Sequence, residues 1–362
     1  MRRRLPLHPS LRCLPALVLA VGVVALLSAA GCLTRKRERV VVVGAGAAGL
    51  ASATALSAVA DVLVLEAQER VGGRVHTNRS LGVPIELGAV WIHRADGNVV
   101  SALASEYGCE SFVSQNKELH IHDEAGAALR PSLVREVYAH LSRVIMPDFL
   151  RRRTALGDDP RRDVDMQALM RRVPSAAALA GERRCIFDFL LFRDVVQDHT
   201  ADLRQSSARE YDTDLYGGSG RDEVLPGGYD CIVRGMAREL QVRTGRAGEV
   251  TSVRYGEAWG VELRTADGAV VTADRVILTL PLGVLKAGLA ASAAAAASAA
   301  VAASASTTAS TTAAAAAPLP RGAVRFDPPM PARWRLPIAA LGWGEAIKVP
   351  HPSLTDKSLT DA

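Results

Sequence analysis

The stretch RVVVVGAGAAGL, residues 39–50, decides the fold of this chain. A run of four valines that meets a glycine at once is typical of a strand buried on both faces of a parallel sheet. The Ala- and Leu-rich residues 47–59 predict a helix, and the sequence VLVL at 62–65 predicts a second buried strand. Strand, glycine-rich turn, helix and strand with short connections form a βαβ unit.

The glycines of this turn follow the GxGxxG spacing of dinucleotide-binding proteins. Gly44 permits the tight turn, Gly46 lets a pyrophosphate approach the backbone, and Gly49 lets the helix pack close to the strand. The helix start offers N–H groups and a partial positive charge to phosphates. Glu66 ends the next strand and can accept hydrogen bonds from a ribose diol, each worth roughly 1.5–3 kcal/mol. An ordinary glycine-rich turn is the alternative.

The residues after Glu66 favour FAD over NAD as the dinucleotide. Residues 70–74, RVGGR, place a second glycine pair between two arginines, as in the GG motif of flavoproteins. Arg74 places a cation near the pyrophosphate or the flavin, where fixed positive charge stabilises the ligand. The alternative interpretation is a solvent-exposed turn with surface arginines. An NAD-dependent dehydrogenase is disfavoured by this segment.

Composition excludes some classes of protein. The chain has 362 residues and a net charge of +5, and residues 1–37 hold seven of its 43 basic residues and no acidic one. The rest carries 36 basic against 38 acidic residues, so no nucleic-acid partner is expected. Cys13 and Cys32 lie in the leader. Cys109, Cys185 and Cys231 show no CxxC spacing, which argues against a zinc ribbon or redox pair and predicts no disulfide framework.

Residues 1–38 are interpreted as a targeting segment. Four arginines precede an apolar stretch at 14–31 that ends in small residues, as in a signal peptide. The stretch is 18 residues long, so it also fits a membrane anchor, which the basic residues 35–37 favour. An organelle transit peptide is a third interpretation. A secretory or membrane-anchored protein is expected, with organelle import left open.

The fold class predicted is α/β, a Rossmann-like FAD-binding domain with an inserted, mostly helical α+β substrate domain. Leu133, Val137, Leu141 and Ile145 recur at helical spacing in the middle of the chain. Strand patterns return from Val250 onward. The predicted regions are 39–95 and 216–286 for the FAD-binding domain, 96–215 for the helical substrate domain, 287–321 for a solvated low-complexity insertion in a loop, 322–349 for the start of a substrate-side sheet and 350–362 for a divergent tail.

His120 and His122 precede Asp123 and Glu124, which raises the question of a metal site. Alternate residues of a strand share a face, but two histidines without a third convergent ligand make a poor site. The segment is interpreted as a hairpin that ends in polar turn residues, and no metal is expected.

From residue 39 to 349 the sequence resembles the flavin-containing amine oxidase family, its polyamine-oxidase-like members in particular. Ordered motifs carry this resemblance: ELGAVWIH at 86–93, GGY at 227–229, VTSV at 250–253, ADRVILTLPLGVLK at 273–286, FDPPMP at 326–331 and LGWGEAIKV at 341–349.

The resemblance implies a role for each matching residue. His93 would lie near the substrate amine, and Lys348 would bind a water near flavin N5. Without the resemblance to the family, His93 would be interpreted as a packed side chain and Lys348 as a charged residue on the surface. Val250 would contact the adenine through its backbone. The residues implied to bind FAD are Gly44, Ala45, Gly46, Gly49, Glu66, Arg74, Gly88, Ala89, Val90, Trp91 and Val250.

The reaction implied is oxidation of an amine C–N bond with dioxygen as the second substrate. The unprotonated amine gives a hydride equivalent to the flavin, the imine hydrolyses to an aldehyde and a smaller amine, and dioxygen leaves as hydrogen peroxide. An amino-acid oxidase, which needs an arginine for the carboxylate, and a catalytically inactive flavin-binding or interaction protein are the alternatives.

The resemblance ends at Lys348 and Val349, and residues 350–362 match nothing in the family at that point. Family members continue for about one further domain. The chain by itself is therefore expected to lack a complete substrate pocket and to be a poor oxidase.

Overall fold

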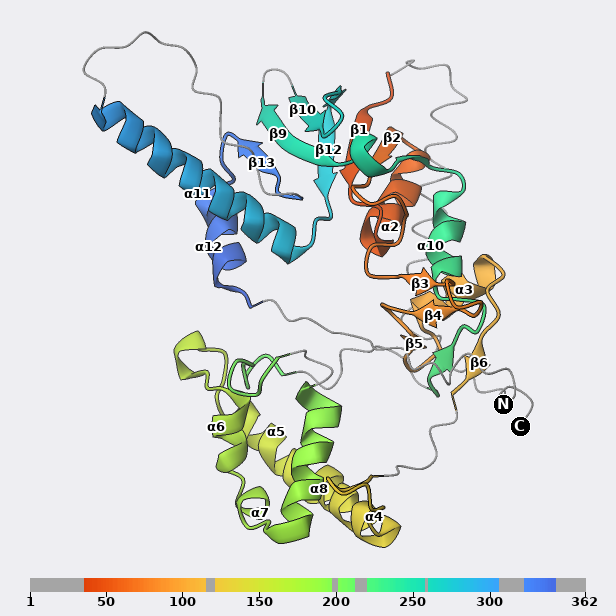
Figure 1. Cartoon of the computed structure of the whole chain (residues 1–362), viewed down its shortest axis with the longest axis vertical. Helices are drawn as coiled ribbons and strands as arrows, with labels where there is room; N and C mark the ends of the chain where they lie inside the picture. Colours follow the sequence, from red (N-terminus) through yellow and green to blue (C-terminus); the bar gives the residue numbers. More distant parts are fainter. Residues whose placement is uncertain are drawn as a thin grey trace, which may run out of the picture.

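A computed structural model describes residues 36–114, 121–196, 201–211, 220–257, 260–305 and 322–342. Two groups of elements with separate hydrophobic cores make up this part of the chain, an α/β unit and a cluster of helices (Figure 1). The architecture is the predicted one, an FAD-binding α/β fold with an inserted helical region.

The first sheet of the α/β unit is built around the valine run. Four parallel strands lie in the order β12-β1-β2-β8, namely Arg275–Leu278, Arg39–Val43, Asp61–Leu65 and Gln241–Arg243. The four valines of β1 are at most 4% exposed, because a strand on each side and packed layers on both faces cover them. Helix α2 (Ala47–Ser57) follows β1 and packs against β2, so the predicted βαβ unit is confirmed.

The second sheet covers one face of the first. Its order is β11-β10-β9-β13, with antiparallel strands Val270–Ala273, Gly260–Thr265 and Val250–Gly256 and the parallel strand Arg325–Asp327. Val41 and Leu65 of the first sheet share a core with Val253 and Leu263 of the second.

The expectation that residues 322–349 start a substrate-side sheet is wrong for the residues described. Strand β13 instead pairs with β9, because Phe326 lies opposite Val253 and packs against the core between the two sheets. Helix α12 (Ala332–Ala340) follows, and residues 343–349 lie outside the described part.

Short strands form the part of the α/β unit beyond the GG motif. Strands β3 (Thr77–Asn78) and β4 (Ile85–Glu86) form a hairpin. Strands β5 (Trp91–Ile92), β7 (Glu223–Val224) and β6 (Phe112–Val113) form a three-stranded antiparallel sheet.

Helices α3 (Val99–Glu106) and α10 (Asp230–Ala237) complete this core. Because α3 and β6 pack in the α/β unit, the boundary predicted at residue 95 lies too early in the chain. The apolar residues of α3 cover α10 rather than the helical region, which a spacing pattern alone does not reveal.

The helical region contains the predicted apolar stripe. Leu133, Val137, Leu141 and Ile145 are at most 5% exposed and form its core together with Phe149. The helices are α4 (Pro131–His140), α5 (Met146–Thr154), α6 (Met166–Arg171), α7 (Pro174–Ala177) and α8 (Gly181–Leu191), with π-helical turns η2 (Leu141–Ile145) and η4 (Phe192–Val196) and the 3-10 turn η3 (Pro160–Arg162).

The low-complexity segment is helical where the structure describes it. Helix α11 runs from Leu282 to Ala305 (Figure 1), so the predicted solvated loop over 287–321 is wrong up to residue 305. Alanine has the highest helix propensity, and a helix that begins at Leu282 extends into the alanines without a break. A Cβ at Gly288 would lie 2.4 Å from the Val324 carbonyl oxygen, so this helix packs closely against the approach to β13. Residues 306–321 lie outside the described part.

The predicted targeting segment falls mainly on residues 1–35, which also lie outside the described part. Within the residues that are described, none of the helices is both long enough and apolar enough to cross a membrane.

Candidate functional site

Two of the three motif glycines are required by the protein's own packing. Gly44 has φ = 106°, and a Cβ there would lie 2.6 Å from Thr279 Oγ1. A Cβ at Gly49 would lie 1.9 Å from the Gly44 carbonyl oxygen, because helix α2 starts almost in contact with the turn. Thr279 closes the turn by donating its hydroxyl to the Val43 carbonyl at 2.9 Å. Thr279 belongs to the ADRVILTLPLGVLK motif of the resemblance, but its role at this turn follows only from the pairing of β1 with β12.

Gly46 is different, because the described residues leave the space beside it open. A Cβ there would meet only the Gly72 carbonyl oxygen, at the ordinary contact distance of 3.9 Å. Gly46 is also the N-cap residue of α2, and no side chain caps that end of the helix. The backbone N–H groups of the first turn and the positive end of the helix dipole are therefore available to an anionic group such as a pyrophosphate.

Glu66 lies next to this turn at the end of β2 and is 8% exposed. Its Oε2 accepts a hydrogen bond from the Ala45 N–H at 2.7 Å, and its Oε1 accepts one from the Gln68 N–H at 2.8 Å. A carboxylate offers about four acceptor positions, so each oxygen keeps one for a ribose hydroxyl. The two backbone bonds fix the orientation of the carboxylate.

The residues around Glu66 place Val250 at the same end of the site. The Glu66 N–H donates to the Arg243 carbonyl at 2.9 Å, and a Cβ at Gly248 would lie 2.4 Å from the Glu66 carbonyl oxygen. Val250, two residues later, is 4% exposed and starts β9. Open space at Gly46, an uncapped helix start and a buried carboxylate on the next strand together fit the pyrophosphate and ribose of FAD.

The GG motif contacts the glycine turn directly. The Gly72 N–H donates to the Ala45 carbonyl at 2.8 Å, and Gly46 and Gly72 form a parallel bridge. Arg70 does not face a ligand site, because its guanidinium donates to the carbonyl oxygens of Val71, Val75 and Gly73 and so shapes the loop. Burial lowers the pKa of Arg70, with the nearby Glu66 carboxylate acting in the opposite direction.

Arg74, by contrast, is exposed and lies where the loop meets the ELGAVWIH segment. The Ala89 N–H donates to the Arg74 carbonyl at 3.3 Å. A Cβ at Gly88 would lie 1.6 Å from that oxygen, so only glycine permits this approach. The structure thus brings the GG motif against the segment implied to run beside the flavin ring.

That segment continues through Val90 into β5, which places Trp91 and Ile92 on opposite faces. Ile92 is 1% exposed and anchors the strand, whereas Trp91 is 37% exposed. The Tyr229 hydroxyl donates to the Trp91 carbonyl at 3.3 Å. Burial raises the pKa of the Tyr229 phenol, and the Glu86 carboxylate adds to the shift.

His93 is paired with an acidic residue that the sequence did not predict. The Nδ1 atom of His93 lies 3.1 Å from Asp222 Oδ2, and Asp222 Oδ1 accepts a hydrogen bond from the Arg94 N–H at 3.0 Å. The Asn98 side chain donates to the His93 carbonyl at 2.7 Å. Arg94, at φ = 49°, is the one non-glycine residue among those described with a left-handed backbone. Asp222 comes from the residues just before β7, 129 positions away, so only strand pairing reveals it.

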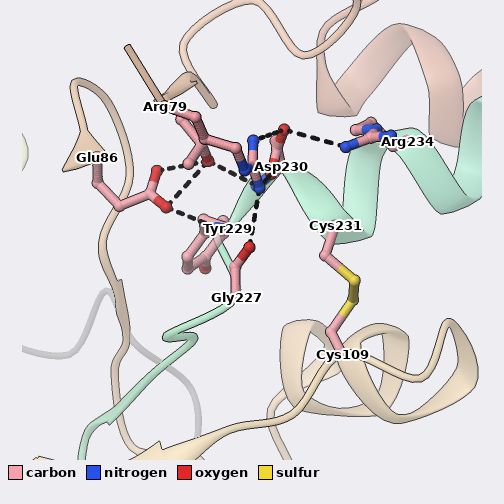
Figure 2. Close-up of a disulfide and its surroundings, with 9 residues drawn as sticks. Arg79, Glu86, Cys109, Gly227, Tyr229, Asp230, Cys231 and Arg234 are labelled. Carbon is pink, nitrogen blue, oxygen red and sulfur yellow. Dashed lines mark hydrogen bonds and ion pairs between the residues drawn. A yellow bond between two sulfur atoms is a disulfide. The ribbon is translucent and has the colours of Figure 1, made fainter. Parts of the chain in front are cut away.

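A side-chain network supports this end of the site (Figure 2). Arg79 donates to both carboxylate oxygens of Asp230 at 2.8 Å and to the Gly227 carbonyl at 2.8 Å. The hydrogen bond from Arg79 lowers the pKa of the Asp230 carboxyl. Glu86 accepts from the Tyr229 N–H at 2.7 Å and thereby caps α10 from another strand.

The prediction that the cysteines form no disulfide framework is wrong. Cys109 and Cys231 form a disulfide with their Cα atoms 6.0 Å apart, and it joins the end of α3 to the first turn of α10 (Figure 2). The two residues are 122 positions apart in the sequence, and no spacing pattern predicts such a pair. Cys185 is a free, exposed thiol.

Two of the predicted positions fall outside the described residues, Lys348 and His120. His122 forms an isolated antiparallel bridge with Ala128, as a hairpin requires. Across the described ranges, His, Cys, Asp and Glu side chains form no group of three or more that is suited to a metal ion.

Comparison with known proteins matches residues 47–350 to the family model described as flavin containing amine oxidoreductase. Among curated proteins of Oryza sativa subsp. japonica, polyamine oxidase 4 is 32% identical over 69% of this chain and 52% of its own length. Polyamine oxidase 1 of the same plant is 30% identical over 88% of this chain and 62% of its own length. Several of the relatives matched have about half of their own length covered by the chain.

Among solved structures, a redesigned putrescine oxidase superimposes with a TM-score of 0.57 at 22% identity. The overlap covers 83% of this chain and 62% of that one. At this identity the similarity supports the fold.

Proposed function

Because the chain belongs to the family of flavin-containing amine oxidoreductases, we propose that it oxidises the C–N bond of a polyamine-like amine with FAD as cofactor. The products would be an aldehyde, a smaller amine and hydrogen peroxide. One observation carries the proposal: an unbroken series of backbone contacts runs from Gly46 through Gly72 and Arg74 to Gly88, and so connects the phosphate end to the Trp91–His93 segment.

Different residues would hold different parts of the cofactor. The N–H groups at the start of α2 and the space beside Gly46 would hold the pyrophosphate, and Glu66 would hold the ribose. Arg74 would supply positive charge, and Gly88 to Trp91 would border the flavin ring. When bound, FAD supplies the acceptor for the hydride equivalent from the carbon next to the amine nitrogen.

His93 and Asp222 would orient the amine. With Asp222 as acceptor, the proton of neutral His93 resides on Nδ1, which gives Nε2 the character of a hydrogen-bond acceptor. An acceptor at that position holds an amine through its N–H and leaves the nitrogen lone pair free. Only the unprotonated amine can release hydride, and a free amine has a pKa near ~10, so the site must also favour loss of its proton.

The polyamine class rests on the names of the curated relatives, seven of which are polyamine oxidases or probable polyamine oxidases that overlap at least 68% of this chain. The test is to purify the chain, record its absorbance spectrum, and measure peroxide release with spermine, spermidine, monoamines and amino acids. A flavin spectrum is expected, and any peroxide released should come from polyamines. A nicotinamide spectrum, or peroxide from amino acids alone, would contradict the proposal.

A second candidate is a flavin-binding protein without turnover. The observation in its favour is the exposure at the flavin end, where Trp91 is 37% exposed and the His93 side chain 40% exposed. An open site admits water and does not hold an amine in reactive geometry. Stoichiometric FAD without peroxide from any amine would support this candidate.

A further inference from the structure

The hairpin of β3 and β4 carries a three-residue motif whose asparagine and serine play no part in the proposed function. Asn78-Arg79-Ser80 is an Asn-x-Ser sequence whose middle residue is not proline, the acceptor pattern for N-linked oligosaccharides. The chain has three asparagines, and this is the one in the motif, since Asn98 and Asn116 are followed two residues later by Val100 and Glu118.

The two polar atoms of the Asn78 side chain differ in their hydrogen bonding. Its Oδ1 accepts a hydrogen bond from the Ser80 N–H at 2.8 Å, which fixes the amide within the motif. Its Nδ2 has no hydrogen-bond partner among the described residues. Asn98 provides the contrast, because its Oδ1 accepts from the Val100 N–H and its Nδ2 donates to the His93 carbonyl. Of the two asparagines that the structure describes, Asn78 is therefore the one whose amide nitrogen is available.

The turn that follows Asn78 lies open to solvent. Arg79 and Ser80 are exposed, and Leu81 is 50% exposed. Gly82 has φ = 82°, and a Cβ there would meet nothing within 4 Å. Asn78 itself is half-buried, and the exposed turn beside it offers room for an attached oligosaccharide. The oligosaccharide would also cover the exposed Leu81 side chain.

The disulfide between Cys109 and Cys231 supplies an independent observation about the compartment. Structural disulfides form and persist in the secretory pathway and outside the cell, and they are rare in the cytosol. N-linked oligosaccharides are attached in that same pathway. The basic start and apolar stretch of residues 1–31 are consistent with entry into it.

We propose that Asn78 is an N-glycosylation site and that the chain meets the glycosylating enzyme in the secretory pathway. The transfer forms a bond between Asn78 Nδ2 and the anomeric carbon of an oligosaccharide. It breaks the bond between that carbon and the pyrophosphate oxygen of a lipid-linked donor, and the lipid pyrophosphate leaves while the amide nitrogen loses one proton. No oxidant or reductant takes part.

The experiment expresses the full chain with its own leader in a eukaryotic cell and adds a second acceptor motif after Ala362 as a reporter of entry into the lumen. The protein is treated with peptide-N-glycosidase in ¹⁸O-water, and peptides are read by mass spectrometry. The variants are Asn78→Gln, Ser80→Ala and Ser80→Thr. Ser80→Thr is the matched control, because threonine keeps the acceptor motif.

Conversion of Asn78 to ¹⁸O-labelled aspartate is expected in the wild-type chain and in Ser80→Thr, and its loss in Ser80→Ala. Asn78→Gln should lose one glycan-sized step in gel mobility. A glycosylated reporter with unmodified Asn78 would overturn the assignment of the site. An unmodified reporter would overturn it as well, because the chain would then never meet the enzyme.

Discussion

The two ends of the proposed FAD site are built in different ways. At the adenosine end, Glu66 follows the parallel strand β2 and Val250 starts β9 of the second sheet. Both residues are buried, and backbone hydrogen bonds and glycine contacts define the geometry. At the flavin end, strands of two residues carry half-exposed side chains, and a disulfide with an ion-pair network holds them in place. One end is set by the sheet itself, and the other by cross-links between side chains.

This difference determines which perturbations should affect each end. The adenosine end should respond less to pH or redox state, because Gly44, Gly46 and Val250 carry neither charge nor thiol and the Glu66 carboxylate is buried and held by backbone N–H groups. The flavin end depends on Cys109–Cys231 and on Arg79–Asp230, both of which respond to solution conditions. Substitutions at the two ends should therefore show separately what determines cofactor affinity, protein stability and the orientation of the substrate-side residues.

The largest effect is expected from removal of the disulfide at the flavin end. The double variant Cys109→Ser, Cys231→Ser should lose up to about 5 kcal/mol of unfolding free energy, because the bond closes a loop of 122 residues in the unfolded chain. Cys185→Ser is the control, since that thiol is free and exposed. Denaturant unfolding measures both. Equal stability of the double variant and the control would show that the sheet core alone holds α3 against α10.

The second comparison lies within the adenosine end. Gly49→Ala should lose about 3 kcal/mol of stability, because its Cβ overlaps the Gly44 carbonyl oxygen. Gly46→Ala should cost the apoprotein at most about 1 kcal/mol, since alanine fits but is a poorer N-cap residue. Gly46→Ala should nevertheless weaken FAD binding at least about tenfold (~1.4 kcal/mol). Thermal unfolding and FAD titration separate the two; unchanged FAD affinity in Gly46→Ala would contradict the phosphate site.

The same contrast explains how much of the structure could be predicted from the sequence alone. The run from Arg39 to Glu66 is local, so its strands, helix and glycine roles could be predicted from spacing. Cys109–Cys231 and His93–Asp222 join residues more than 120 positions apart, and no periodic pattern encodes them. The prediction of a loop for the alanines up to residue 305 is wrong because it relied on an apolar face, which their small side chains do not form, and not on their high helix propensity.

Glu66→Gln tests whether the buried carboxylate holds the ribose. Both carboxylate oxygens of Glu66 accept a hydrogen bond from a backbone N–H. In the glutamine variant an NH₂ group replaces one of these oxygens, so two donors would face each other at that position. FAD affinity should fall about 10- to 100-fold (~1.4–2.8 kcal/mol). Glu69→Gln, three residues on and exposed, should leave affinity unchanged. Similar FAD dissociation constants for the two variants would remove Glu66 from the site.

Asp230→Asn tests the charged support of the flavin end as a function of pH. The folded-state pKa of Asp230 is lowered by Arg79, so the stabilisation is complete above the unfolded pKa of about 3.9 and is lost as pH falls through the lower, folded value. At neutral pH the variant should be about 2 kcal/mol less stable, and the difference should vanish in acid. Asp61→Asn is the matched control at the other end, because its ion pair with Arg37 is exposed. A stability difference for Asp230→Asn that does not shrink as pH falls below about 3.9 would contradict the electrostatic account.

Asp222→Asn should have the smallest effect, because it alters orientation rather than packing. Its amide oxygen can still accept from the Arg94 N–H, but its NH₂ group would face His93 Nδ1 as a donor and favour the tautomer with the proton on Nε2. An acceptor aimed at the amine then becomes a donor, so kcat/KM should fall about tenfold (~1.4 kcal/mol) with the unfolding free energy unchanged. Nitrogen-15 NMR of the histidine ring reads the tautomer directly and does not depend on turnover. If the proton stays on Nδ1 in Asp222→Asn, Asp222 does not position His93, and this end of the site is held by the backbone contacts alone.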